Sequence, residues 1–450
     1  MNKTTRDNFG SRFGVLVAMA GSAVGLGNLW RFPYLMGQNG GAAFIILYLI
    51  FVVFICIPIM MCEFIIGRHS HANAFGAFKK LAPKTYWKIG GLMAVISPIL
   101  ILSFYFVVGG WSIKYLFEAC KFSFTTGSLN AEGMFTSFIS DTYPPLTYNF
   151  LFLGLTGLVI AIGVKKGIEA FSKIMMPLLF VIIIIIAVRS LTLPGAGAGI
   201  EYLFKPDFSK VNSHTVLAAL GQAFFSLSLG AGTILTYASY VSNSENIVKC
   251  SIYTAIADTL FAIIAGCAIM PAVFSFGISP SEGPGLVFVT LPNIFASLPL
   301  GGLIAILFFV SLFLAAITSA ISLLEVVIAY LTEELKMGRK IAVLISFVAF
   351  FILSALCSLS LGELKDFHIF GLTFFDLCDY ISANVLMTLG SLIVVSFVGW
   401  RLKEAIIVEE LTNGGTISMP AWFLKGLYFL IRYIAPLVIL VIFITSTISK

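Results

Sequence analysis

The stretch "GSAVGLGNLWRFPY", residues 21–34, decides the fold class of this chain. It lies in an apolar range, 13–36, that is long enough to cross a membrane, yet it has three glycines within seven residues and then a proline. Non-helical backbone at membrane depth is tolerated only where protein or a polar cavity satisfies its N–H and C=O groups. The stretch therefore predicts a helix that is broken inside the membrane and lines a polar site.

The composition identifies the solvent around this helix. Of 450 residues, 59% are hydrophobic and only 11% are charged, which excludes a water-soluble globule. We predict an all-α integral membrane protein with a single domain, residues 1–450. Eleven apolar ranges are long enough to cross a hydrocarbon core of about 30 Å: 13–36, 42–67, 89–117, 146–163, 168–188, 214–240, 248–276, 300–332, 341–357, 373–400 and 422–447.

Charge predicts the orientation. An odd number of spans puts the two termini on opposite sides. With the N-terminus inside, the inner segments hold 16 Lys and Arg residues and the outer segments hold seven. The positive-inside rule therefore favours a cytoplasmic N-terminus and an extracellular C-terminus. No small-residue cleavage site follows the first apolar range, so we expect no removable signal peptide.

Several classes of function lack support in the sequence. The seven cysteines are far apart and indicate neither a disulfide framework nor a CxxC metal site, and the four histidines have no HExxH spacing. No basic stripe interleaved with aromatics suggests nucleic acid. An enzyme would need a nucleophile with a base or a metal cluster, and no such spacing occurs. We expect no catalytic residue, no organic cofactor and no obligate protein partner.

The break has a counterpart five helices later. "SLSLGAG", residues 226–232, interrupts the sixth apolar range with small residues and glycine. Breaks at corresponding positions of two halves, 13–188 and 214–400, are typical of a transporter built as a 5+5 inverted repeat with a midplane binding site. The helix at 422–447 is then additional. The alternative is that these glycines only allow close helix packing.

A broken helix offers carbonyl groups to a cation and N–H groups to an anion, and a helix N-terminus adds a field that favours a carboxylate. The two breaks therefore predict a binding site for an ion and an acid together. A channel could share such polar broken helices, but it would need a continuous pore.

Three stretches carry a resemblance to a known family. "AMAGSAVGLGNLWRFPY", "GQAFFSLSLGAGTILTYASYV" and "AAITSAISLLE" closely resemble the first, sixth and eighth helices of the neurotransmitter:sodium symporter family, specifically its bacterial amino-acid transporters with the LeuT-like fold. The resemblance covers helices one to ten. The chain has eleven predicted helices where many relatives have twelve. The resemblance also implies a location in the bacterial inner (plasma) membrane.

The resemblance implies two sodium sites built from hard oxygen ligands. The first would use Ala23, Asn28, Ser226, Asp258 and the carboxylate of the substrate. The second would use the carbonyls of Gly21, Val24 and Ala315 with the hydroxyls of Thr318 and Ser319. Without the resemblance, this Thr-Ser pair would be read as ordinary back-bonding to the preceding helical turn.

The resemblance also implies a binding site for an amino acid between the two broken helices. The substrate carboxylate would meet the amides of Leu26 and Gly27 and the hydroxyl of Tyr105. The residues implied in substrate binding are Ser22, Ala23, Gly25, Leu26, Gly27, Ile101, Tyr105, Phe225, Ser226, Ser228, Ala231, Ser319 and Leu323. Relatives that carry amines without a carboxylate have an aspartate where this chain has Gly25, which favours an α-amino acid as the substrate here.

Gates follow from the same resemblance. Arg31 and Phe225 match the arginine and the aromatic lid of the extracellular gate. For the acidic partner in "FDLCDY" we choose Asp379 and keep Asp376 as the alternative.

On the cytoplasmic side, Arg6 is expected to pair with Glu333 and Tyr240, with Phe9 where relatives have tryptophan. Any of these gate charges could instead be a solvated interfacial residue.

Two further features belong to the resemblance. Glu63, an acid inside the second apolar range, is expected to accept hydrogen bonds from the broken segments, because an intramembrane acid needs partners. Gly167, with nine residues before Pro177, matches a spacing that lets the fifth helix unwind in relatives. The alternative for that helix is a static proline kink.

The chain departs from chloride-dependent relatives in its seventh helix. It keeps Tyr48, Gln222 and Ser226, but Asp258 stands where those relatives have a sodium-binding asparagine, and Ala262 replaces a serine. A fixed carboxylate would balance sodium directly, since a neighbouring cation favours the ionised form of an acid. The alternative is a neutral acid held by hydrogen bonds.

Taken together, these residues predict sodium-coupled uptake of hydrophobic or aromatic L-amino acids by alternating access, with two sodium ions and no need for chloride. The alternative within the same family is symport of another small amino acid or an amine.

Overall fold

The computed structural model describes residues 8–125, 129–278 and 286–448, and within these residues the regular structure is helical. There is no strand in this part of the chain, only an isolated β-bridge between Ile369 and Leu372. The predicted all-helical class is therefore confirmed. The apolar surface buried between the helices forms one continuous core.

The helical segments of the first half differ widely in length, from 3 to 33 residues. Their bounds are α1 Arg12–Ala23, η1 Gly27–Arg31, α2 Phe32–Gln38, α3 Ala42–Phe51, η2 Val52–Cys56, α4 Ile57–Ser70, α5 Ala74–Leu81, α6 Lys88–Cys120, η3 Ser123–Thr125, α7 Ala131–Ser140, α8 Tyr143–Ile162, η4 Val164–Glu169, α9 Ala170–Leu191, α10 Ala196–Phe204 and η5 Phe208–Lys210.

The second half continues in the same way. Its helices are α11 Ser213–Ser226, α12 Thr233–Ala238, α13 Ile247–Ser275, α14 Thr290–Ser297, α15 Gly301–Glu333, α16 Arg339–Leu359, α17 Phe374–Tyr380, η7 Ile381–Leu386, α18 Met387–Ser396, η8 Phe397–Arg401, α19 Glu404–Leu411, α20 Ala421–Phe429, η9 Leu430–Ile434 and α21 Ala435–Ile448.

Nine of the predicted ranges hold a continuous helix that is long and apolar enough to cross a membrane, within the described residues. The first range becomes a tenth when Arg12–Ala23 and Gly27–Gln38, which are bent by 48°, are counted as one span. The remaining range, 214–240, holds two shorter helices, α11 and α12, separated by residues 227–232. The structure thus has nine to ten apolar spans by length and composition, where the sequence predicts eleven.

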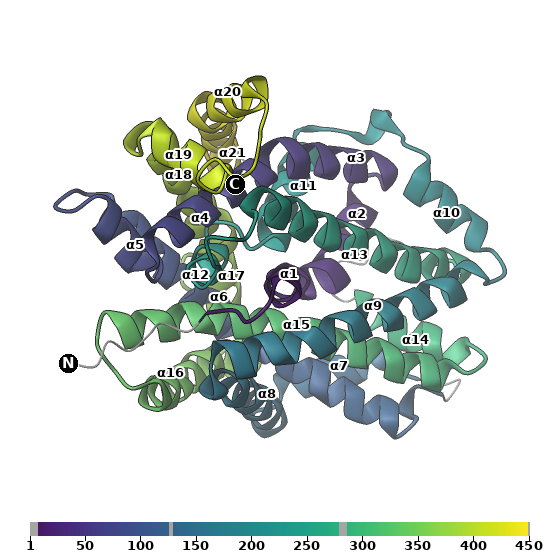
Figure 1. Cartoon of the computed structure of the whole chain (residues 1–450). Helices are drawn as coiled ribbons and strands as arrows, with labels where there is room; N and C mark the ends of the chain where they lie inside the picture. Colours follow the sequence, from purple (N-terminus) through teal and green to yellow (C-terminus); the bar gives the residue numbers. More distant parts are fainter. Residues whose placement is uncertain (1–7, 126–128, 279–285, 449–450) are drawn as a thin grey trace.

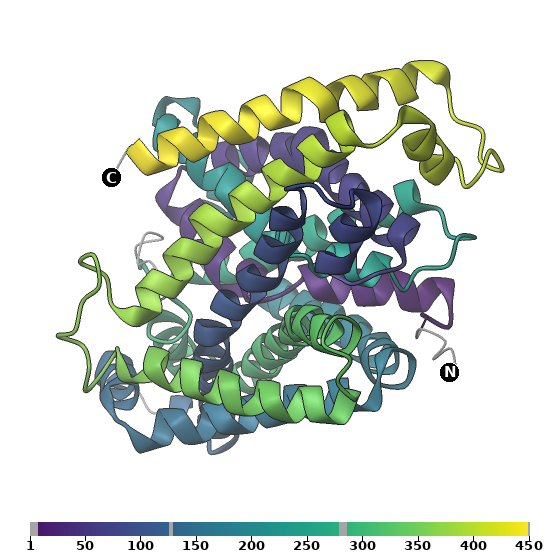
Figure 2. The same ribbon diagram turned by 90° about the vertical axis from the view of Figure 1, so that its left-hand side faces the viewer.

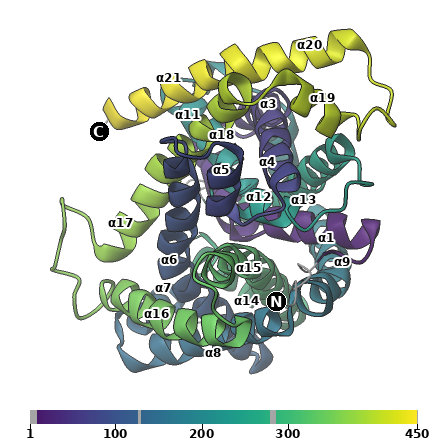
Figure 3. The ribbon, with the colours of Figure 1, turned by 60° about the vertical axis from the view of Figure 1, so that its left-hand side comes forward.

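The broken helix α1 lies near the centre of the molecule. It packs against α13, α15, α9 and α12, and Figure 1 shows it enclosed by these long helices. In Figure 2 the start of α1 and the end of α21 lie at opposite sides of the molecule. Figure 3 shows α20 and α21 on the outside, next to α18. The broken helix is therefore surrounded by protein, as a helix break at membrane depth requires.

Candidate substrate and ion-binding site

The first break begins where α1 ends. Val24 leaves the helix with φ −68° and ψ 109°, and helical structure resumes at Gly27. The Gly25 N–H donates to Asn28 Oδ1 at 2.9 Å, which fixes the loop. A Cβ atom at Gly25 would lie 2.3 Å from Ser319 Oγ, so only glycine fits. The break is thus held by its own side chains and pressed against α15.

The second break is held by Glu63 on α4. The backbone runs through positive φ at Ser228 (52°), Gly230 (76°) and Gly232 (73°). Glu63, which is fully buried, accepts hydrogen bonds from Gly230 N at 2.7 Å and Leu235 N at 3.2 Å. The carboxylate therefore accepts one hydrogen bond from the break, at Gly230, and one from the first turn of α12, at Leu235, where helical N–H groups have no carbonyl partner within the helix.

The two breaks face each other. Gln222 Nε2 on α11 donates to Gly27 O at 2.9 Å, and Ser228 Oγ donates to Ser22 O at 3.2 Å. A Cβ atom at Gly27 would lie 3.1 Å from the Phe225 ring. Segments about 200 residues apart in the sequence thus form one polar region inside the helical bundle.

Asp258 on α13 gathers three of the residues expected at the first sodium. Asn28 Nδ2 lies 2.8 Å from Asp258 Oδ1 and 3.0 Å from Ser226 Oγ, while Ser226 Oγ donates to Asp258 Oδ2 at 2.8 Å. Tyr48 also donates to Asp258 Oδ2, at 3.1 Å. Asn28, Asp258 and Tyr48 have no exposed surface. This cluster offers several oxygen atoms around one buried carboxyl group, and Ala23 lines the adjoining pocket.

The residues expected at the second sodium meet where α15 passes α1. Ser319 Oγ lies 3.5 Å from Gly21 O and 3.2 Å from Val24 O. Thr318 Oγ1 bonds back to Ala315 O at 3.1 Å, and a Cβ atom at Gly21 would lie 3.5 Å from Thr318 Cβ. Ser319 therefore contacts the end of α1 directly, whereas the Thr318 hydroxyl is bonded back to its own helix, to Leu314 O and Ala315 O.

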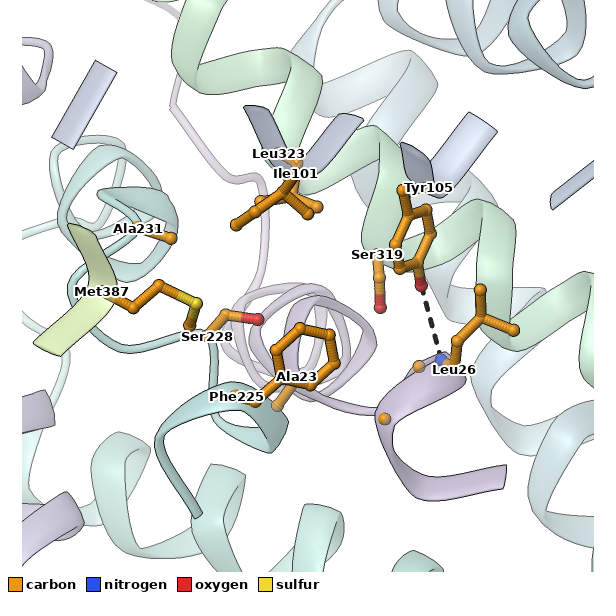
Figure 4. A pocket seen from close by; sticks show the side chains of 12 residues that line it. Ala23, Leu26, Ile101, Tyr105, Phe225, Ser228, Ala231, Ser319, Leu323 and Met387 are labelled. Atoms are coloured by element: carbon orange, nitrogen blue, oxygen red, sulfur yellow. Dashed lines mark hydrogen bonds between the residues drawn. The ribbon is translucent and has the colours of Figure 1, made fainter. Parts of the chain in front are cut away.

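A small pocket lies between the two breaks. Figure 4 shows a polar end, where the Leu26 N–H donates to the Tyr105 hydroxyl at 3.4 Å and Ser319 lies beside it. Ala231 lies toward the opposite end. The pocket is lined by Ala23, Gly25, Leu26, Gly27, Ile101, Tyr105, Phe225, Ser228, Ala231, Ser319, Leu323 and Met387.

The lining agrees with the sequence expectation except at three residues. Ser22 and Ser226 were expected at the substrate but do not line the pocket; Ser22 contributes its carbonyl to Ser228 and Ser319. Met387, at the start of α18, lines the pocket and was missed. A methionine on an apolar helix carries no pattern that distinguishes a pocket residue from a core residue.

Arg31 covers the pocket from the side of α2. Its guanidinium carbon lies 4.6 Å from the centre of the Phe225 ring. Tyr34 is close enough to interact electrostatically with both Arg31 and Asp379. The alternative acid, Asp376, is instead bonded to Thr373 Oγ1 at 2.7 Å in the cap of α17. The surroundings of Arg31 therefore favour Asp379, and Tyr34 is a residue that sequence reasoning missed.

Arg6, which was expected at the cytoplasmic gate, lies outside the described residues. Its expected neighbours are described. Phe9 packs edge-on against Tyr237 and Tyr240, with ring centres 5.7 and 6.3 Å apart. Glu333 accepts hydrogen bonds from the backbone and side chain of Asn73, at 2.8 and 3.0 Å.

Tyr240 is bonded to an acid, Glu325, that the sequence analysis did not name. Its hydroxyl donates to Glu325 Oε1 at 2.9 Å, and Arg339 reaches the same carboxylate with both Nη atoms, at 3.1 and 2.5 Å. Glu325 is fully buried in α15. A glutamate within an apolar span is itself a signal that could have pointed to this pair.

The fifth helix has the irregular start that its sequence suggested. Gly163 takes φ 105°, and residues Val164–Glu169 form a π-helical segment before α9, which contains Pro177. A Cβ atom at Gly167 would lie 2.2 Å from Val159 O, so the segment needs glycine to approach α8. Whether this segment unwinds is a matter of dynamics and stays a prediction.

Comparison with known proteins gives consistent matches along the chain. A model of the sodium:neurotransmitter symporter family matches residues 6–132 and 145–450. An uncharacterized sodium-dependent transporter of Bacillus subtilis (strain 168), YhdH, is 40% identical over 435 residues, 96% of each chain. An uncharacterized sodium-dependent transporter of Haemophilus influenzae is 37% identical over 462 residues, 99% of each chain. The crystal structure of MhsT in complex with L-phenylalanine superposes with a TM-score of 0.92 at 45% identity, over 98% of this chain and 100% of MhsT.

Proposed function

This chain belongs to the sodium:neurotransmitter symporter family, and on that basis we propose that it takes up hydrophobic or aromatic L-amino acids together with sodium by alternating access. It is a sodium-dependent, multi-pass membrane transporter. The observation that carries the finer proposal is the pair of facing helix breaks, with buried oxygen clusters on either side of one pocket.

Two sodium ions are proposed, one in each oxygen cluster. The first would be held by Ala23, Asn28, Ser226 and Asp258, and the second by Gly21, Val24, Ala315, Thr318 and Ser319. Carbonyl, hydroxyl, amide and carboxylate oxygens are the hard donors that such a cation prefers. Two oxygen pairs support the proposal: Ser226 Oγ lies 2.8 Å from Asp258 Oδ2 in the first cluster, and Ser319 Oγ lies 3.2 Å from Val24 O in the second.

We propose that the carboxylate of the amino acid binds at the polar end of the pocket. The Tyr105 hydroxyl and the N–H groups of Leu26 and Gly27 provide hydrogen-bond donors there. The absence of a side chain at Gly25 supports a substrate that brings its own carboxylate, since Ser319 leaves no room for an aspartate at that position.

The side chain of the substrate would then extend toward Ile101, Ala231, Leu323 and Met387. Ala231 is small and fully buried, so it leaves space for an aromatic ring. The complex of MhsT with L-phenylalanine supports this preference, because MhsT shares the fold at 45% identity. The alternative, a smaller amino acid or an amine, would leave the apolar end of the pocket unfilled.

Asp258 is proposed as the fixed negative charge that makes chloride unnecessary. Its carboxyl accepts hydrogen bonds from Asn28, Ser226 and Tyr48, and a sodium ion bound beside it would favour the ionised form. Two sodium ions moved with a zwitterion would gain about 4.6 kcal/mol per 100 mV of membrane potential. That energy alone supports about a thousandfold accumulation of substrate.

For the topology we propose eleven spans in a bacterial inner membrane, with α11 and α12 as one broken span and the N-terminus in the cytoplasm. Arg31 and Asp379 would close the extracellular side. Arg6, Glu333 and Tyr240 would close the cytoplasmic side, and the segment between Gly167 and Pro177 would unwind to hydrate the second sodium.

Uptake of radiolabelled L-phenylalanine into proteoliposomes tests this function. We expect saturable uptake that requires an inward sodium gradient and is competed by tyrosine, tryptophan and leucine. A channel would give flux that does not saturate. Competition by all twenty amino acids separates the aromatic preference from the alternative: strongest competition by glycine, alanine or an amine would overturn the substrate assignment while leaving sodium coupling intact.

A further inference from the structure

An arginine inside the last apolar span has no acidic partner in the part of the chain that the structure describes. Arg432 lies in η9, within the span Ala421–Thr445, which is the most exposed of the nine spans with only 22% of its apolar window buried. Among the described residues no carboxylate forms an ion pair with it, and its Nε is buried without an acceptor. A cation within a membrane span is costly unless a counter-charge is near.

Aromatic rings surround this guanidinium. Its central carbon lies 5.4 Å from the centre of the Trp400 ring and 5.6 Å from those of Tyr428 and Tyr433. Trp400 and Tyr433 are themselves 61% and 47% exposed, so the cluster faces the lipid rather than the core. Cation–π contacts hold a guanidinium in place but do not neutralise it.

The cluster is built on two helices that touch directly. Trp400 Nε1 donates to Arg432 O at 2.9 Å, and the Tyr428 hydroxyl donates to Gly399 O at 3.4 Å. A Cβ atom at Gly399 would lie 2.9 Å from Arg432 Cα, so the backbones of η8 and η9 are in contact. The side chain of Arg432 is therefore positioned where the backbones of these two segments meet.

Further cations lie at the same end of these helices. Arg401 and Lys403 follow Trp400 directly, and Lys425 lies seven residues before Arg432, on the same helix face. All three are exposed. The exposed acids of the next helix, Glu404 and Glu409, form no ion pair with any of them. The loop 401–421 also belongs to the side that the positive-inside count assigns to the cytoplasm.

We propose that the cluster of Arg432, Trp400, Tyr428 and Tyr433 binds the phosphate of an anionic phospholipid from the inner leaflet. The guanidinium would donate to the phosphate oxygens with its Nη groups, one of which also donates to the Tyr428 hydroxyl at 3.0 Å, as arginine does with phosphates in general. The rings would lie at headgroup level, where tryptophan and tyrosine are favoured. Basic pockets between helices on the cytoplasmic side are suited to such headgroups.

Titration of the purified full-length chain in a neutral detergent tests the proposal, with the unfolding temperature as the readout. The additives are short-chain phosphatidylglycerol, short-chain phosphatidylcholine and inorganic phosphate. A ligand that binds the folded state raises the unfolding temperature. We expect phosphatidylglycerol to raise it and the other two not to. A shift of equal size with inorganic phosphate would contradict a lipid ligand, and equal shifts with both lipids would contradict a site for the anionic headgroup.

Variants locate the effect. Arg432→Gln should raise the half-maximal phosphatidylglycerol concentration about fivefold, the effect of one cation near a lipid surface. Arg189→Gln, which removes an arginine from the end of another span without an aromatic cluster, is the matched control and should leave it unchanged. Equal responses of the two variants would overturn the site. If Arg432→Gln does not fold, Trp400→Leu removes the ring and should weaken binding, whereas an unchanged titration would contradict the proposal.

Discussion

Asn28, in the break of the first helix, donates its side-chain N–H to Asp258 Oδ1 at 2.8 Å and accepts the Gly25 N–H with its own oxygen at 2.9 Å. One amide thus connects the shape of the break to a fully buried acid on α13. We therefore expect a change in the charge of Asp258, or an ion bound beside it, to alter the backbone that lines the pocket. Sodium binding at Asp258 and the shape of the pocket should therefore depend on each other.

Thr318→Val tests the second sodium site. The valine keeps the shape of the threonine but removes one oxygen ligand of a cation, an interaction of about 1.5–3 kcal/mol. We expect the sodium concentration for half-maximal substrate binding to rise about tenfold or more. Thr332→Val is the matched control, because Thr332 makes the same back-bonds on the same helix, to Ile328 O and Ala329 O. Equal sodium affinities in the two variants would refute the assignment.

Ala231→Phe tests the apolar end of the pocket. Ala231 has no exposed surface, and a ring at this position would occupy the space that we assign to the side chain of the substrate. Overpacking of this kind excludes a bulky ligand. Binding of phenylalanine and tryptophan should weaken at least about tenfold, while leucine binding persists and shows that the variant is folded. An unchanged order of preference would place the substrate ring elsewhere.

Gly230→Ala tests the second break. The residue has φ +76°, and a Cβ atom would lie 2.1 Å from Met387 O. Gly414 has a similar φ of +66° with nothing within 4 Å, so Gly414→Ala isolates the conformational cost, about 1–2 kcal/mol. We expect a much larger fall in unfolding temperature for Gly230→Ala. Similar falls in both variants would show that α18 yields at this contact.

The pair of Glu325 and Arg339 predicts a non-additive effect on stability. Arg339→Gln leaves a fully buried carboxylate with Tyr240 as its remaining strong donor, and removing one partner of a buried pair costs about 3–5 kcal/mol. Adding Glu325→Gln should recover much of that loss. Arg12→Gln, which breaks a pair whose arginine is 74% exposed, should cost less than about 1 kcal/mol. Thermal unfolding of these three variants and of the single variant Glu325→Gln measures this, and additive losses would contradict it.

The sequence predicted those parts of the fold that depend on local pattern. Long apolar ranges predicted the spans to within a few residues, as for 300–332 against Gly301–Glu333. The glycines at 21–27 predicted the break after Ala23, because no regular helix tolerates so many flexible residues near a proline. The small residues and glycines at 226–232 predicted the break in the sixth range in the same way, and residues 227–232 separate α11 from α12.

Side-chain contacts between different helices could not be predicted in the same way. Glu325 and Arg339 pair because α15 and α16 turn back on each other, and Met387 reaches the pocket because Gly230 lets α18 approach. Neither contact has a spacing in the sequence. The expected ligand residues came from the resemblance to a family, and the structure then brought them into two clusters that composition and periodicity alone do not indicate.

We propose above all that uptake is driven by sodium and that the Asp258 carboxylate, in place of chloride, balances the charge of the bound sodium. Uptake of L-phenylalanine into proteoliposomes, driven by a sodium gradient with gluconate replacing chloride on both sides, tests it most directly in wild type and Asp258→Asn. The account predicts that wild type transports equally well with and without chloride, and that the variant loses sodium affinity in gluconate. Chloride-dependent uptake by wild type, or full sodium affinity of the variant without chloride, would contradict it.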